Sequence, residues 1–320
     1  MQLFEQHGFH PRGDLGQNFL IDLNLIESIV QRADLSARDV VLEVGAGTGG
    51  LTTFLAQSAG HVVSVEYDRR MFALAESAVA ESPRVTLLQC DALKNKNRLS
   101  PIVVDAITAA LDALHVDGPT LKLVANLPYN IATPVISNLI ASDLPWSRMV
   151  VTVQFELGLR LAAKPGTSGY GSLSVWVQSQ SRVKLIRKLS PNVFWPRPQV
   201  DSAIVGITPD EAAAASIHDR KFFQRYIRGV FNHRRKLLRG VLRGLYREEL
   251  SKAEVDRVLD DQNLHSQQLA ETMNVAAHVD LANALKVAID SRAGQSGNDA
   301  GRRPAIGETP PPGKSPATKQ

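Results

Sequence analysis

The stretch from Val40 to Gly50 constrains the fold more than any other part of this chain. It reads Val-Val-Leu-Glu-Val-Gly-Ala-Gly-Thr-Gly-Gly, so a short apolar run leads into a cluster of glycines. Apolar residues at helical spacing follow at Leu51, Phe54 and Leu55. This pattern predicts a buried parallel strand, a tight turn and the start of a helix. Glycines in such a turn allow positive φ angles and let the backbone approach a ligand closely.

A second apolar run, residues 62–65, ends in Glu66. A carboxylate at the end of the second strand can accept hydrogen bonds from both hydroxyls of a ribose. The glycine turn and this acid together predict a nucleoside-binding site in a doubly wound α/β sheet. The alternative is a glycine turn that holds no ligand.

The glycine cluster can be read in two ways, and they predict different nucleosides. Gly45, Gly47 and Gly50 fit the dinucleotide pattern G-x-G-x-x-G of an NAD-dependent oxidoreductase. Glu43 disfavours that reading, because its carboxylate would repel a pyrophosphate and attract an ammonium or sulfonium cation. An oxidoreductase would also need a catalytic His, a Tyr–Lys pair or a metal at the sheet edge, and none is evident. The spelling E-x-G-x-G-x-G resembles the motif of S-adenosylmethionine-dependent methyltransferases.

The composition predicts a soluble cytoplasmic protein. A chain of 320 residues is long enough for one large domain and a small one. No apolar run approaches the ~20 residues needed to span a bilayer, and the N-terminus lacks the features of a signal peptide. The single cysteine, Cys90, excludes an internal disulfide and favours a reducing compartment. We interpret Cys90, which follows an apolar run, as a structural thiol and not a nucleophile.

Strand-like and helix-like segments alternate up to a strand at residues 149–153. Two closely spaced strands follow, at residues 183–186 and 202–207, which predicts a parallel sheet closed by an antiparallel pair. Asp91 follows the strand at residues 85–88, where its carboxylate can accept from the exocyclic amine of an adenine. A solvated turn aspartate is the alternative reading of Asp91.

The composition changes at Asp210, after which no strand pattern appears. We therefore predict a methyltransferase-like domain over residues 1–209, a small helical domain over 210–290 and a disordered tail over 291–320. Residues 220–247 carry ten Lys or Arg and no Asp or Glu. This basic face fits a nucleic-acid partner, although a solvated basic surface is the alternative.

The sequence Asn126-Leu127-Pro128-Tyr129 lies where the fourth strand ends, a place where α/β sheets put reactive groups. An adenine N6 amine is a poor nucleophile because its lone pair is delocalised into the ring. The Asn126 side-chain oxygen and a backbone carbonyl at Leu127 or Pro128 can accept from its N–H groups and draw it toward tetrahedral geometry. Proline stiffens this loop, and Tyr129 offers a face on which a flipped base can stack. A turn with a capping Asn is the alternative.

Phe194 precedes the rigid sequence Trp195-Pro196-Arg197-Pro198. It can close on the opposite face of the target base, or it can be a core residue. Because a sulfonium is a good leaving group, this chemistry needs no metal, and we expect no metal site.

Six segments, in their order and spacing, resemble the ribosomal RNA adenine N6,N6-dimethyltransferases. They are Leu15-Gly16-Gln17-Asn18-Phe19-Leu20, the segment 43–49, Glu66, Asp91-Ala92, the segment 126–131 and the segment 194–202. The similarity runs from about residue 9 to about residue 285 and is stronger to the small-subunit enzymes than to the macrolide-resistance branch. Residues 94–119 look longer than is usual in that family, and the sequence assigns them no role.

The resemblance implies a Rossmann-like fold with a small all-helical C-terminal domain. It implies transfer of methyl groups from S-adenosylmethionine to two adjacent adenosines in a hairpin near the 3′ end of 16S rRNA, in the assembling small ribosomal subunit. We expect a monomer. The residues implied to line the cofactor are Asn18, Leu20, Gly45, Glu66, Asp91 and Asn126. Those implied to hold the target base are Asn126, Tyr129 and Phe194.

Two further functions remain open. A non-catalytic assembly factor could use the same fold to bind pre-ribosomal RNA, although the intact glycine turn and Asn126-Leu127-Pro128-Tyr129 favour activity. A DNA adenine methyltransferase would more often carry Asp and a second Pro where this chain has Asn126 and Tyr129.

Overall fold

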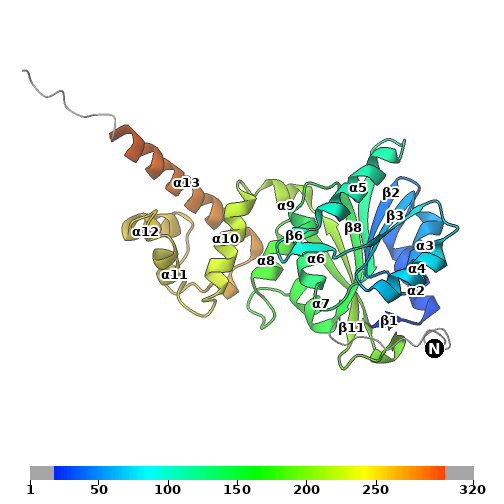
Figure 1. Ribbon diagram of the computed structural model, residues 1–320. Coiled ribbons are helices and arrows are strands. Elements are labelled where there is room, and N and C mark those ends of the chain that lie inside the picture. The colour runs from blue at the N-terminus through cyan, green and yellow to red at the C-terminus, as the bar shows by residue number, and fades with distance from the viewer. Residues whose placement is uncertain (1–17, 300–320) are drawn as a thin grey trace, which may run out of the picture.

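The computed structural model describes residues 18–299, and side chains up to residue 293. Its centre is a seven-stranded sheet with the order β4-β3-β2-β7-β8-β11-β9 (Figure 1). The parallel strands are β2 (Asp39–Val44), β3 (His61–Glu66), β4 (Val85–Gln89), β7 (Thr120–Asn126) and β8 (Trp146–Gln154). β11 (Ser202–Pro209) lies antiparallel between β8 and β9 (Ser181–Leu189). The predicted parallel sheet with an antiparallel pair is therefore confirmed.

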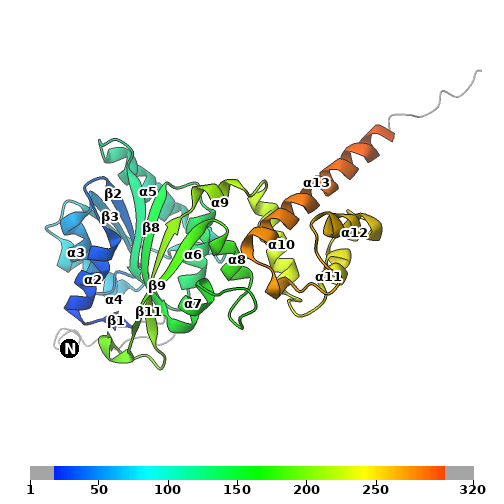
Figure 2. The same ribbon diagram turned by 180° about the vertical axis from the view of Figure 1, so that it is seen from behind.

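Helices cover both faces of the sheet (Figures 1 and 2). One face carries α2 (Leu23–Ala33), α3 (Gly50–Ser58) and α4 (Arg69–Val79). The other carries α5 (Pro101–Ala113), α6 (Ala132–Ala141) and α7 (Phe155–Leu161). All six residues of β2 are buried as a result, which explains why its apolar residues Val40, Val41 and Leu42 follow one another without alternation.

Two short strand pairs were not predicted from the sequence. β1 (Phe19–Leu20) pairs antiparallel with β10 (Phe194–Trp195), and Ile21 N donates to the Val193 carbonyl at 3.0 Å. β5 (Leu93–Asn95) and β6 (Arg98–Leu99) form a hairpin within the segment to which the sequence assigned no role. Strands this short carry no periodicity, so only the tertiary contacts reveal them.

The chain beyond β11 forms a helical region, residues 210–299, in which the structure shows helices and no strand. Its helices are α9 (Glu211–Ala215), α10 (Arg220–Phe231), α11 (Leu238–Leu245), α12 (Lys252–Asp261) and α13 (Val275–Asp299). Between residues 18 and 299, no helix is both long and apolar enough to cross a membrane.

The helical region and the sheet share one hydrophobic core. Trp176 of α8 (Ser172–Gln178) packs on Phe223 of α10 with ring centroids 6.4 Å apart. The Tyr170 hydroxyl donates to the Met273 carbonyl at 2.9 Å, and Gly166 N donates to the Glu271 carbonyl at 2.7 Å. The position of the helical region relative to the sheet is thus set by buried contacts.

The predicted start of the disordered tail, residue 291, is wrong. Helix α13 continues to Asp299. Arg292 donates to the Glu249 carbonyl at 3.1 Å and to the Glu254 carboxylate at 3.0 Å, which holds this turn against α12. The remainder of that predicted tail, residues 300–320, lies outside the described residues.

Several of the cations in residues 220–247 are paired with acids, so this segment offers fewer free positive charges than its sequence implied. Arg239 of α11 pairs with Asp256 and Asp260 of α12, at 3.0 and 2.8 Å. Arg243 pairs with Asp256, and Arg234 lies 3.4 Å from Glu271. Acids that are distant in sequence therefore neutralise much of α11, whereas no salt bridge of α10 occurs within the described residues.

Candidate active site

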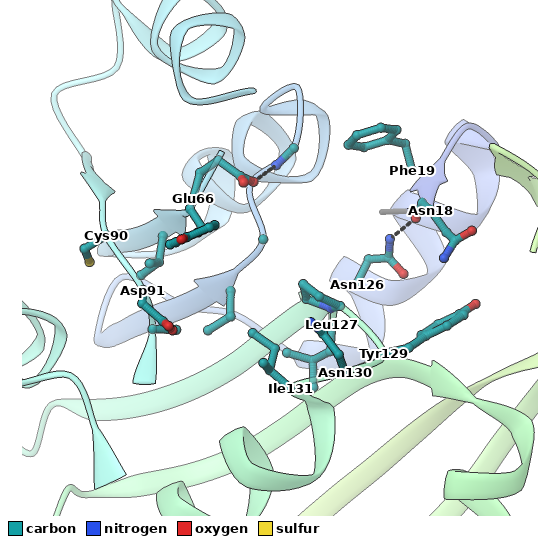
Figure 3. A pocket seen from close by; sticks show the side chains of 17 residues that line it. Asn18, Phe19, Glu66, Cys90, Asp91, Asn126, Leu127, Tyr129, Asn130 and Ile131 are labelled. Carbon is teal, nitrogen blue, oxygen red and sulfur yellow. Dashed lines mark hydrogen bonds between the residues drawn. The ribbon is translucent and has the colours of Figure 1, made fainter. Parts of the chain in front are cut away.

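A cleft with a volume of about 200 Å³ opens at the carboxyl ends of the parallel strands (Figure 3). The glycine turn after β2, the ends of β3 and β4 and the loop after β7 form its walls, and residues 18–19 lie over one side. The cleft brings together most of the predicted site residues, namely Asn18, Gly45, Glu66, Asp91, Asn126, Leu127, Pro128 and Tyr129. Leu20 and Phe194 do not line it.

The glycine turn distinguishes between the two readings of the motif. Gly49 has φ +82°, and a Cβ there would lie 3.0 Å from Ala78 Cβ and 3.1 Å from Ala75 Cα in α4. Gly50 begins α3 without a positive φ, and the nearest atom to its Cβ position is 3.9 Å away. The backbone therefore requires the glycines of E-x-G-x-G-x-G and not the third glycine of the dinucleotide pattern.

The Glu66 carboxylate is 7 % exposed at the end of β3 and is held by two backbone amides. Gly47 N donates to one oxygen at 2.8 Å, and Asp68 N donates to the other at 2.9 Å. Burial raises the pKa of Glu66, and these two hydrogen bonds partly offset the rise. Each oxygen keeps one further acceptor position, so the geometry fits a pair of ribose hydroxyls.

Glu43 lies beneath the glycine turn and does not line the cleft, so any attraction of a bound cation acts without direct contact. Its side chain is 1 % exposed, and one carboxylate oxygen accepts from the hydroxyls of Thr52 and Ser64, both at 2.6 Å. Burial raises the pKa of Glu43 to about 7. Through these two hydrogen bonds Glu43 ties β2 to β3 and α3.

Asp91 and Cys90 form the wall on the side of β4 (Figure 3). One Asp91 carboxylate oxygen accepts from Leu93 N at 2.8 Å, so the predicted cleft position and the alternative turn geometry are both present. Burial, together with the neighbouring Asp91, raises the pKa of the Cys90 thiol. A raised pKa keeps the thiol protonated, which agrees with a non-nucleophilic residue.

Asn126 ends β7 and faces the cleft with its amide fixed in one orientation (Figure 3). Its Nδ2 donates to the Asn18 carbonyl at 2.7 Å. Its Oδ1 is buried and accepts no hydrogen bond from any described residue. A buried amide oxygen without a donor costs about 1–3 kcal/mol, so its presence in the cleft indicates a ligand N–H.

Of the two backbone carbonyls after Asn126, only one is left free by the described residues to accept a hydrogen bond from a ligand. The Pro128 carbonyl accepts from Ile131 N and Ala132 N, both at 3.1 Å, and so starts α6. Within residues 18–299, no group donates to the Leu127 carbonyl. Of the two carbonyls that the sequence left open, Leu127 therefore remains available as the second acceptor.

The hydroxyl of Tyr129 forms a 2.5 Å hydrogen bond with the hydroxyl of Ser202 on β11. Ser202 is fully buried, so this contact anchors the far end of the Tyr129 ring. Burial raises the pKa of Tyr129, which keeps its hydroxyl protonated. The sequence did not predict this contact, because only the sheet brings Ser202 to Tyr129.

Phe194 is 2 % exposed and packs in the core with Ile29, Val150 and Ile204. Phe194 therefore does not line the cleft. The alternating neighbour Trp195 points the other way and stacks on Phe19 with ring centroids 6.4 Å apart. The role in holding the base remains a prediction for Phe194, and so does the cofactor contact for Leu20.

The glycine turn yields a first prediction with a matched control. Gly49→Ala forces a Cβ into a positive-φ site against α4, so we expect a loss of about 1–2 kcal/mol in the free energy of unfolding, together with weaker binding of S-adenosylmethionine. Gly50→Ala replaces glycine at an ordinary helical position and should be neutral or stabilising by up to about 1 kcal/mol. Urea denaturation and calorimetry test both. A larger loss of stability in Gly50→Ala than in Gly49→Ala would instead favour the dinucleotide pattern G-x-G-x-x-G.

Burial of Glu43 predicts a pH-dependent stability. Because its pKa is raised from 4.5 to about 7 on folding, the folded state binds more protons between these values, and the free energy of unfolding falls as the pH rises through this range. Glu43 should account for a loss of roughly 2 kcal/mol between pH 5.5 and pH 8. Glu43→Gln keeps a hydrogen-bond acceptor without titrating, so its urea midpoint should vary less with pH. Parallel curves for both proteins would contradict the predicted ionisation.

The profile of one protein family, described as ribosomal RNA adenine dimethylase, matches residues 8–280. Curated relatives include the ribosomal RNA small subunit methyltransferase A of Pediococcus pentosaceus, 38% identical over 89% of this chain and 93% of that protein. The protein of the same name from Moorella thermoacetica is 35% identical over 89% of this chain and 96% of its own length.

Two solved structures share the fold. A dimethyladenosine transferase from Plasmodium falciparum superimposes with a TM-score of 0.71 at 22% identity, covering 84% of this chain and 98% of that one. The 23S rRNA methyltransferase ErmE gives a TM-score of 0.60 at 20% identity, covering 84% of this chain and 100% of that one. With the glycine turn, the ribose acid and the Asn126 amide in one cleft, the chain belongs to the ribosomal RNA adenine dimethylase family, whose enzymes methylate ribosomal RNA with S-adenosylmethionine as the donor.

Proposed function

We propose that this chain methylates N6 of two adjacent adenosines in a hairpin near the 3′ end of 16S rRNA, twice each, on the assembling small ribosomal subunit. The relatives' name, small subunit methyltransferase, supports the substrate. The observation that carries the chemistry is the buried Oδ1 of Asn126, which has no donor among the described residues and is held in orientation by the Asn18 carbonyl. We further propose that the chain acts as a monomer in the cytoplasm.

The residues of the cleft fit the methyl donor. Glu66 would accept from the ribose hydroxyls, Asp91 from the adenine amine, and the Gly45 backbone would lie against the donor with no Cβ in the way. Glu43 and Glu66 make this end of the cleft electronegative, which favours a cationic ligand over a pyrophosphate. When bound, S-adenosylmethionine supplies the methyl carbon, and its sulfur leaves as a neutral thioether.

Asn126 Oδ1 and the Leu127 carbonyl would accept from the two N–H groups of the target N6. These hydrogen bonds draw the nitrogen lone pair out of conjugation and aim it at the methyl carbon, and such alignment lowers the barrier by several kcal/mol. As the new N–C bond forms, N6 becomes cationic and releases a proton to water at the cleft mouth. After the first transfer one N–H remains, so a single acceptor suffices to orient the second.

Tyr129 would stack on the flipped base and define its plane. The hydrogen bond to Ser202 fixes the ring, so little conformational freedom is lost when the base arrives. The base must leave its stack to reach N6, which is the usual route of enzymes that act on a nucleobase. The helical region over residues 210–290 would contact RNA through the cations that acids do not neutralise.

Methyl transfer from labelled S-adenosylmethionine to small subunits that lack dimethyladenosine tests the proposal. Mass mapping of the RNA should locate two adjacent dimethyladenosines near the 3′ end of 16S rRNA. Methyl groups found at other positions would show that the proposed substrate is wrong. Cofactor binding without incorporation would favour the assembly-factor reading.

Asn126→Ala should abolish most of the transfer and leave cofactor binding weakened but present. Loss of an oriented acceptor typically lowers kcat by roughly 10²–10³, and the substitution also removes the donor to the Asn18 carbonyl. Single-turnover kinetics separate this effect from cofactor affinity. Asn24→Ala, on the exposed side of α2, is the control and should keep the wild-type rate. Normal turnover by the Asn126 variant would remove that residue from the mechanism.

A further inference from the structure

The β5–β6 hairpin rises directly from the wall of the cleft. Asp91 and Ala92 line the cleft, and Leu93 begins β5. Ser100 N donates to the Ala92 carbonyl at 2.9 Å and closes the base of the hairpin. Leu93 and Leu99 are 9 % and 7 % exposed and belong to the main core. The hairpin is therefore rooted in the same core that supports the cleft.

The tip of the hairpin is also fixed. Asn97 N donates to Asn95 Oδ1 at 2.9 Å, and Asn138 Nδ2 of α6 lies 3.5 Å from the Lys96 carbonyl. From the other side, an Arg228 guanidinium nitrogen of α10 lies 3.4 Å from Asn97 Oδ1. Figure 1 shows β6 between α6 and α10, at the junction of the sheet and the helical region.

Three cations project from this rigid hairpin. Lys94, Lys96 and Arg98 are exposed, and the sequence carries no acid from residue 92 to residue 104. In the described part of the chain, none of the three forms a salt bridge. They differ in this respect from Arg239 and Arg243 of α11, which acids of α12 neutralise.

The exposed face of α10 continues this set of cations. Lys221, Arg225 and Arg228 are exposed and follow each other at i, i+4 and i+7, so they lie along one stripe of the helix. Arg228 contacts the hairpin at Asn97. The stripe and the hairpin thus form one basic track, defined as Lys221, Arg225, Arg228, Lys94, Lys96 and Arg98, that leads from the helical region to the cleft wall.

We propose that the β5–β6 hairpin is a phosphate clamp that holds the RNA strand beside the target adenosine and connects the cleft to the α10 stripe. The proposal rests on the proposed function, since it names the surface that delivers that RNA. Exposed cations that no acid neutralises release counterions when they meet phosphates. A clamp already fixed by the core loses little conformational entropy on binding.

The partner is RNA and not an acidic protein segment, because the track ends at the cleft in which a nucleobase must be placed. The strand that carries the target base has to pass close to the cleft, and the hairpin, which continues the chain from the wall residue Ala92, presents three exposed cations there. Phosphate contacts of this kind position a strand without reading its sequence. The hairpin would therefore set the position of the strand, and the cleft would select the adenine.

The test is the triple variant Lys94→Ala, Lys96→Ala, Arg98→Ala in the full chain. Its control is Lys184→Ala, Arg187→Ala, which removes two exposed cations from the edge strand β9 and is compared with the triple variant per charge removed. The probe is an RNA hairpin with two adjacent adenosines in its loop. Binding is measured across a salt series, S-adenosylmethionine affinity by calorimetry, and KM and kcat on small subunits.

We expect the triple variant to fold normally and to bind S-adenosylmethionine as the wild type does, because only exposed side chains change. Its slope of log K against log salt should fall by about 0.7–0.9 for every phosphate that the variant no longer neutralises. KM for the RNA should rise roughly tenfold, while kcat stays within about twofold. The control should match the wild type.

The outcomes separate the clamp from the reaction. An unchanged salt slope and unchanged RNA affinity in the triple variant would overturn the clamp, whatever the methylation assay gives. A reduced slope in the variant, with no methyl transfer by the wild type, would support the clamp and reject the proposed reaction. Equal losses in the control would show a general charge effect and would also overturn the clamp.

Discussion

The hydrogen bond from Asn126 Nδ2 to the Asn18 carbonyl is the interaction on which the arrangement of the site depends. It turns the amide so that Oδ1 faces the cleft, where no described residue donates to it. The Asn18 carbonyl is in place because β1 pairs with β10, and β10 is in place because Phe194 is buried in the core. Phe194 therefore helps to hold the strand pair that positions the Asn18 carbonyl, and with it the Asn126 amide.

A second constraint is electrostatic. Glu43 and Glu66 are both buried beside the glycine turn, and burial raises the pKa of each. Such a pair is costly, because no Lys, Arg or His among the described residues forms a salt bridge with either carboxylate. A bound sulfonium and ammonium would lower that cost. In their ionised form the same two acids would repel a pyrophosphate, so this end of the cleft would favour a cationic ligand.

The central sheet and most of the cleft followed from the sequence because their signals are local. β2 contains the apolar run Val40-Val41-Leu42, the glycines mark a turn, and Asn126-Leu127-Pro128-Tyr129 is contiguous. What the sequence did not reveal depends on contacts between distant residues. The side of the β10 strand on which Phe194 lies is fixed by its pairing with Leu20 of β1. Asp256 of α12 neutralises two arginines of α11. Arg292 near the end of α13 forms hydrogen bonds with Glu249 and Glu254.

The shared core has a consequence for specificity. Because Trp176 packs on Phe223 and Tyr170 bonds to Met273, the helical region is held in place relative to the cleft. If α10 binds phosphates and Tyr129 stacks on the target base as proposed, a substrate has to present both groups at a fixed separation. An RNA of another shape can make one of these two contacts but not both. It therefore binds more weakly, because it lacks the binding free energy of the other contact. Selection would therefore come from the shape of the folded RNA, with base identity read only inside the cleft.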